Sequence, residues 1–159
     1  MTTEPVTPAS GSIADAYPPP EIAARVCQLG LAKVNTAVPT MVALAVLAGA
    51  FISLGALFYT VTITVGNESL ALPFGVLRLV GGMTFSLGLI LVVVGGAELF
   101  TGNNLIAMAW AARCVQTRQV VRNWVWVYLG NLLGAGGTAV LVLLAGVHTL
   151  GDGAVGETM

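Results

Sequence analysis

Residues 93–104 read VVGGAELFTGNN and decide how this chain folds. The stretch begins as the end of a long apolar run, yet it contains glycines, a carboxylate, a threonine and two asparagines. Unsatisfied polar groups cost several kcal/mol each in lipid, so a regular spanning helix does not accommodate such a cluster. Irregular backbone at membrane depth occurs where it is buried in protein or lines a watery path. The pattern therefore predicts a broken helix at a permeation site.

The composition indicates a membrane protein. The chain has 159 residues, of which 57% are hydrophobic and 8% are charged, and its mean hydropathy is +0.92. Soluble domains carry about 25% charged residues, so this chain has too few charges to cover a surface exposed to water. We therefore expect the lipid bilayer to be its main partner. The net charge of −1, with no basic tract, gives no support for nucleic-acid binding.

The cysteines and the single histidine do not predict a metal or cofactor site. Cys27 and Cys114 are too few for a disulfide framework and lack a metal-ligand spacing. His148 is the only histidine, which argues against a zinc site formed by His and Cys. We expect both thiols to be small buried or interfacial side chains.

Four regions follow from the distribution of residue types. Residues 1–20 are rich in Pro, Ser, Thr and Ala and predict a disordered tail. Residues 21–36 have apolar side chains at helical spacing and predict an amphipathic cytoplasmic helix. That helix could lie at the membrane interface or on a neighbouring subunit, or simply cap the bundle. Residues 37–150 form the expected three-span domain, and residues 151–159 a polar tail.

The uncharged runs locate the expected spans. A hydrocarbon core takes about 20 helical residues to cross. The uncharged stretch between Lys33 and Glu68 allows a first span, and a turn at residues 66–69 is prolonged by Pro73 and Gly75. Uncharged runs at 79–97 and 99–112 are too long together for one straight helix, which favours a broken or re-entrant element. A third span is predicted from near residue 124 to about residue 147.

Basic residues predict the orientation. With the N-terminus in the cytoplasm, five basic residues face inwards and one faces outwards, which agrees with the positive-inside rule. The inward set is Arg25, Lys33, Arg113, Arg118 and Arg122, and the outward residue is Arg78. We expect a bacterial inner (plasma) membrane protein with a cytoplasmic N-terminus.

The segment GAELFTGN at residues 96–103, preceded by FSLGLILVVVG and followed by RNWVWVYLGNLLGA, resembles the formate/nitrite transporter family. The likeness covers nearly all of residues 20–148. It implies an all-α membrane protein with three transmembrane helices, the second broken by a pore-lining loop, as an aquaporin-like half-repeat. It also implies a homo-oligomer, a pentamer with one pore per protomer, in which each protomer has two three-span halves in inverted orientation.

The resemblance implies roles for individual residues. Two apolar side chains on the second span would narrow the pore, and the loop that follows would line it. The threonine of the loop would face a histidine from the second half and orient the permeating anion. The implied pore residues are Phe85, Leu89, Leu99, Phe100, Thr101 and Asn103, and the implied structural residues near the loop are Gly96, Glu98 and Gly102.

Physical reasoning on the same residues leaves alternatives open. A small carboxylate in an apolar passage pays a desolvation cost that hydroxyl and amide donors lower, and Thr101, Asn103 and Asn104 offer such donors. Thr101 could instead cap the following half-helix, and the apolar pair on the second span could be simple helix packing. Glu98 is interpreted as a structural acceptor for loop amides or as the partner of an arginine rather than as a proton carrier.

Small residues spaced four apart have a packing interpretation. Gly130 and Gly134 on the third span, and Gly49 and Ser53 on the first, let helix backbones approach closely. Protomer packing is the default role of such pairs.

The chain departs from the family in having three spans and no match to the central histidine, because His148 follows the third span. A truncated product, a split gene or a half that pairs with another chain would each explain this. The leading hypothesis is channel-like transport of small monovalent anions such as formate or nitrite, needing a second half-domain. The alternative is a membrane interaction subunit that does not transport, or a truncated product. No enzyme is expected, because Ser86, Glu98 and His148 form no recognisable triad.

Overall fold

The computed structural model describes residues 17–64 and 72–159 of the chain. Most of the expected N-terminal tail, up to residue 16, and the expected turn at residues 66–69 lie outside these ranges. Within them the chain is helical and contains no strand, so the expected all-α class is confirmed. The elements are α1 (Pro19–Asn35), α2 (Val38–Ile63), α3 (Phe74–Val94), α4 (Phe100–Asn103), α5 (Ile106–Ala111), α6 (Thr117–Leu144), η2 (Val147–Thr149) and α7 (Ala154–Thr158).

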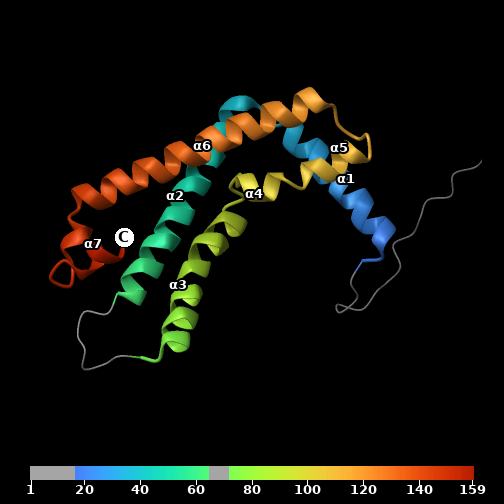
Figure 1. Ribbon diagram of the computed structural model, residues 1–159. Helices are drawn as coiled ribbons and strands as arrows, with labels where there is room; N and C mark the ends of the chain where they lie inside the picture. The colour runs from blue at the N-terminus through green and yellow to red at the C-terminus, as the bar shows by residue number, and fades with distance from the viewer. Residues whose placement is uncertain (1–16, 65–71) are drawn as a thin grey trace, which may run out of the picture.

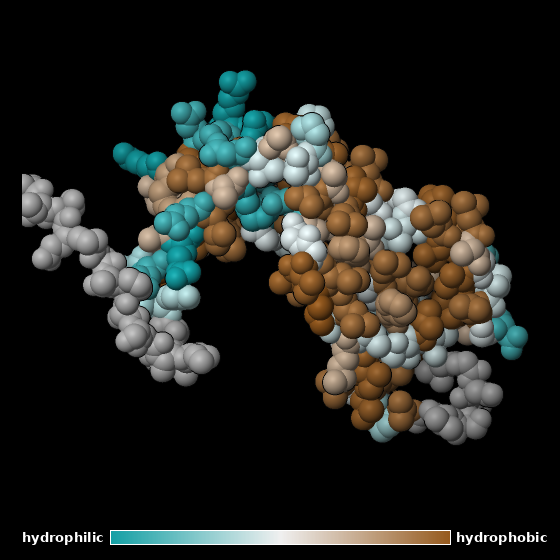
Figure 2. Space-filling view, turned by 180° about the vertical axis from the view of Figure 1, so that it is seen from behind, coloured by the Kyte–Doolittle hydropathy of each residue, from teal (hydrophilic) through white to brown (hydrophobic). Residues whose placement is uncertain are grey.

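The three helices α2, α3 and α6 are long and apolar enough to cross a membrane. Figure 1 shows α2 and α3 side by side, with α6 crossing α2; α1 and α5 lie together at one end, and α4 lies between the end of α3 and α5. Most of the surface over the spanning helices is hydrophobic, and hydrophilic residues gather at the end formed by α1, α5 and the start of α6 (Figure 2). This distribution suits a protein whose middle faces lipid and whose ends face water.

Two spans begin earlier than the sequence predicts. The α3 helix begins at Phe74, directly after Pro73, so Gly75 lies in its first turn rather than in a loop. Proline has a fixed φ that suits the start of a helix. The α6 helix begins at Thr117 rather than near residue 124, because the side chains of Gln116 and Gln119 form a reciprocal capping box there.

Glycines set the spacing between α2 and its two neighbours. A Cβ added at Gly49 would collide with the backbone of α6 at Asn131, and one added at Gly134 would collide with the backbone of α2 at Val46. On the other side of α2, Gly55 and Gly88 face each other, and a Cβ on Gly88 would lie 2.7 Å from the Phe51 carbonyl oxygen. Backbones this close require glycine, so these residues pack helices within the chain.

A disulfide joins α1 to the connection between α5 and α6, which differs from the two thiols expected. Cys27 and Cys114 are bonded across a sequence separation of 87, with their Cα atoms 6.0 Å apart. The reason is the packing of α1 on α5, where Gly30 lies against Ala109. This arrangement brings two distant cysteines to bonding distance.

The C-terminal residues are more ordered than a polar tail. They form the short helix α7, in which the side chain of Val155 is 3% exposed. Positive φ angles at Gly151 and Gly153 let the chain reverse direction after η2. The tail therefore folds back towards α2 instead of extending into solvent.

Candidate functional site

The break in the second span lies where the sequence predicts it. The α3 helix ends at Val94, and the chain turns at Gly95 and Gly96, the latter with a φ of +61°. Helical structure resumes only at Phe100, after Leu99 in extended conformation. Figure 1 shows that α4 runs in a different direction from α3. The predicted interruption between Val94 and Asn103 is confirmed.

Asn131 holds the extended segment in place. Its Oδ1 accepts a hydrogen bond from the Phe100 amide at 2.9 Å. Its Nδ2 donates to the carbonyl oxygens of Glu98, at 2.9 Å, and Ala45, at 2.8 Å. The Glu98 amide in turn donates to the Leu44 carbonyl oxygen at 3.2 Å. Backbone groups that a helix would have paired are therefore satisfied by α2 and α6.

Asn131 also shows the depth of the break. It lies near the midpoint of the 28-residue helix α6. The extended segment is thus at the level of the middle of a spanning helix, where irregular backbone needs protein partners. The sequence analysis did not identify this residue. A lone amide in the apolar stretch VYLGNLLGA could have indicated it, because polar residues inside spans are candidates for function.

Glu98 forms an ion pair with a lysine of α1. The Lys33 Nζ atom is 2.7 Å from Oε2 of Glu98, and Glu98 is 8% exposed. The predicted partner was an arginine or the loop amides, and the structure supplies a lysine instead. The pair joins α1 directly to the broken part of the second span. A buried carboxylate needs such a partner, because an unpaired charge is costly to bury.

A cavity of about 310 Å³ opens between the end of α3 and the break. Most of the predicted residues line it, together with Lys33 of the ion pair. The predicted residues in its wall are Leu89, Gly96, Leu99, Thr101, Gly102 and Asn103. Its surface is thus apolar with one cation, one hydroxyl and one amide.

Two of the predicted pore residues lie outside this cavity. Phe85 lines a separate cavity of about 320 Å³ further along α3, between α2 and α3. The Phe100 ring packs edge-on against α6, with its centroid 6.4 Å from that of Trp124 and 5.6 Å from that of Tyr128. The structure therefore brings Leu99 and Thr101 together but directs Phe100 to the other side of the break.

Asn103 is fully buried and largely committed to α6. Its Nδ2 donates to Oδ1 of Asn123 at 2.9 Å, and its carbonyl oxygen accepts from Nε1 of Trp124 at 3.1 Å. The Asn103 Oδ1 atom has no partner among the described residues. The Asn103 amide nitrogen, which the sequence analysis expects to donate to the permeating anion, thus donates to Asn123 instead. Asn103 presents an acceptor instead.

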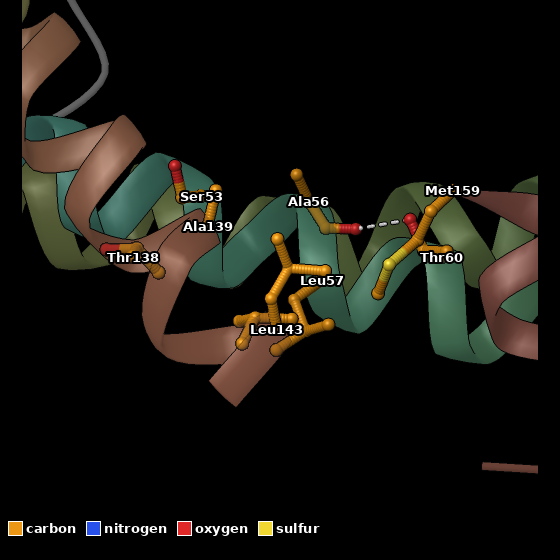
Figure 3. A pocket seen from close by; sticks show the side chains of 9 residues that line it. Ser53, Ala56, Leu57, Thr60, Thr138, Ala139, Leu143 and Met159 are labelled. Atoms are coloured by element: carbon orange, nitrogen blue, oxygen red, sulfur yellow. Dashed lines mark hydrogen bonds between the residues drawn. The ribbon is translucent and has the colours of Figure 1, made fainter. Parts of the chain in front are cut away.

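Another cavity, of about 320 Å³, lies between α2 and α6 and has a different character. Figure 3 shows aliphatic side chains such as Leu57 and Leu143 around it, with Met159 at one end. The hydroxyls of Thr60 and Thr138 donate to carbonyls of their own helices. No group of three or more His, Cys, Asp or Glu side chains placed for a metal occurs in the described part of the chain. The break in the second span is therefore the candidate site.

These features define an integral membrane protein with a spanning helix broken at mid-depth, a class in which such breaks line paths through the bilayer. The chain belongs to the formate/nitrite transporter family, whose model matches residues 20–159.

Relatives and solved structures agree with this assignment. The chain is 46% identical to the formate channel FocA of Escherichia coli strain K12 over 110 residues, which is 69% of this chain and 38% of that protein. It is 40% identical to the formate channel BtFdhC of Bacillus thuringiensis over 120 residues, 75% of this chain and 45% of that protein. A solved pentameric formate channel with formate bound superposes with a TM-score of 0.62 at 38% identity, covering 76% of this chain and 46% of that one. The chain thus spans less than half the length of these relatives.

Proposed function

We propose that this chain forms one half of a transmembrane pore for small monovalent anions, with formate as the principal substrate and nitrite as a further one. The observation that carries the proposal is the broken span, whose cavity holds Thr101 among apolar side chains with Lys33 at its wall. Relatives that match most of this chain are formate channels. A second three-span segment would supply the remaining wall.

Each group has a physical role in passage. Phe85 and Leu89 make a narrow apolar stretch that excludes hydrated ions, because stripping water from a charge is costly. Thr101 supplies a hydroxyl that donates to a carboxylate or nitrite oxygen where that water is lost. The Lys33 ammonium also lines this cavity, but its charge is balanced by Glu98 at 2.7 Å, so the ammonium acts on the anion as a hydrogen-bond donor rather than as a free charge.

The proposal includes orientation and assembly. Positive-inside counting puts the N-terminus and the connection between α5 and α6 on the cytoplasmic side of a bacterial inner membrane. The cytoplasm is reducing, so we expect Cys27 and Cys114 to be thiols there and to form their disulfide once the chain is exposed to oxidant. A solved relative is a pentamer, and this chain exposes apolar residues along α3 and α6 that suit contacts with further helices. We propose a pentamer in which each protomer contains its own pore.

Formate flux in proteoliposomes tests the function. The full chain is reconstituted alone and, in parallel, joined in frame to a second three-span half, as the family resemblance implies, taken from E. coli FocA. The joined protein should carry formate well above empty liposomes, and oligomer size is checked by native electrophoresis. A correctly assembled joined protein with no flux above background would refute the proposal and favour a membrane subunit that does not transport.

A further inference from the structure

Arg78 lies on the same line along α3 as the proposed apolar stretch of the pore. Phe85 and Leu89 follow it by seven and eleven residues. These separations are close to two and three full turns of a helix, so the three side chains leave α3 in nearly the same direction. Arg78 is about 10 Å from Phe85 along the axis. It lies near the first turn of α3, whose other end adjoins the break.

The neighbours of Arg78 form the wall of the cavity that contains Phe85. This cavity is lined by Tyr59 and Gly82 as well as by Phe85. The Nη1 atom of Arg78 donates a hydrogen bond to the Tyr59 hydroxyl, and Gly82 is one turn further along α3. The guanidinium therefore lies beside Tyr59 of the cavity wall, near the end of α3 away from the break.

Aromatic contacts fix the position of the charge. The guanidinium carbon is 5.0 Å from the ring centroid of Phe74 and 6.0 Å from that of Tyr59. Arg78 remains exposed to solvent. A cation over aromatic rings is held without losing its charge, since arginine stays protonated in proteins. The result is a water-accessible positive charge in a fixed place.

We propose that Arg78 is the residue that attracts the anion at this mouth of the pore, and that its ligand is a small monovalent carboxylate or oxyanion. The inference rests on the proposed function and adds an entry step to it. The charge raises the local anion concentration directly in line with Phe85 and Leu89. Its guanidinium fork also matches the two oxygens of formate or nitrite.

Charged thiol reagents measure this attraction without requiring transport. In the full chain with Cys27→Ser and Cys114→Ser, Gly82→Cys places a probe in the cavity, where an added Cβ meets nothing within 4 Å. The reaction rates of a negatively charged and a positively charged methanethiosulfonate are then compared. The Cβ atoms of residues 78 and 82 are about 6 Å apart, and the Arg78 charge lies further out on its side chain. Arg78→Gln should therefore slow the anionic reagent by up to about threefold and speed the cationic one similarly.

Matched variants separate charge from structure. Arg78→Lys keeps the charge and should keep the ratio of the two rates. Arg118→Gln removes the same charge from an exposed position at the start of α6 and should leave the ratio unchanged. If Gly82→Cys does not fold, Ala56→Cys on the facing α2 wall of the same cavity serves as the probe. A ratio that Arg78→Gln does not alter would overturn the inference.

Flux in the joined protein distinguishes this inference from the proposed function. Arg78→Gln should lower initial formate uptake about threefold at low ionic strength. The difference should vanish in about 1 M impermeant salt, where the Debye length is only about 3 Å. A loss of uptake that persists in high salt would overturn the electrostatic role. If the unmodified pore carries no formate while the reagent ratio still depends on Arg78, the attraction stands and the transport proposal fails.

Discussion

Replacing Asn131 should destabilise the break in the second span more than any exposed amide substitution could. Asn131→Leu keeps the approximate volume and removes three hydrogen bonds, to Phe100, Glu98 and Ala45. Hydrogen bonds contribute about 0.5–1.5 kcal/mol each, so three contribute about 1.5–4.5 kcal/mol. Hydrogen bonds between membrane helices average about 0.6 kcal/mol, which favours the lower half of that range. We expect a loss of about 1.5–3 kcal/mol in unfolding free energy.

The measurement is unfolding by SDS titration in mixed micelles. Far-UV circular dichroism reports the whole chain. In a background with Trp110→Phe and Trp126→Phe, the fluorescence of Trp124, which packs against Phe100, reports the break. Asn131→Asp keeps the acceptor for the Phe100 amide but turns a carboxylate towards two carbonyl oxygens, so it should be no less destabilising.

Asn104→Ala is the matched control, because Asn104 is exposed at the end of α4 and should change stability by less than about 0.5 kcal/mol. An Asn131→Leu protein within about 0.5 kcal/mol of the unmodified chain would refute the role of Asn131 in holding the loop.

Three further predictions concern permeation, topology and cross-linking. Thr101→Val in the joined pore should reduce formate flux about ten- to a hundredfold, because a hydrogen bond to a charged group contributes about 1.5–3 kcal/mol. Thr101→Ser keeps the hydroxyl and should retain most of the flux. Equal flux from the two variants would show that the hydroxyl has no role in permeation. With the native cysteines replaced by serine, a cysteine at Asp152 should react with an impermeant reagent on intact cells and one at Gln119 should not; the reverse pattern would invert the orientation. Chain purified without reductant should migrate faster in non-reducing electrophoresis than after reduction, and two titratable thiols per native chain would argue against the Cys27–Cys114 bond.

The break could be predicted because its cause is local. Glycines and polar residues inside an apolar run conflict with a lipid-facing helix, and the conflict is visible in residues 93–104 alone. The direction of Phe100 could not be predicted in the same way. It depends on the tilt of the four-residue helix α4, which follows from where Asn131 anchors the Phe100 amide.

Contacts between segments far apart in the chain could not be predicted from the sequence alone. Lys33 and Glu98 are 65 residues apart in the sequence, and Asn131 is 86 residues from Ala45, the residue of α2 to which it donates a hydrogen bond. The two cysteines looked unremarkable because nothing in their spacing shows that α1 packs on α5. Such partners are set by helix packing, which depends on the whole bundle rather than on any one segment.

The glycine contacts of α2 limit how this sequence can diverge. At Gly49 and Gly134 even one methyl group would meet the backbone of the opposite helix, which cannot turn aside as a side chain can. Any larger residue would push α6 away from α2 and carry Asn131 with it, so the loop geometry would change as well. Substitutions should therefore accumulate more readily at positions exposed in the single chain, such as Leu133 and Leu144, while the seam between α2 and α6 stays nearly fixed.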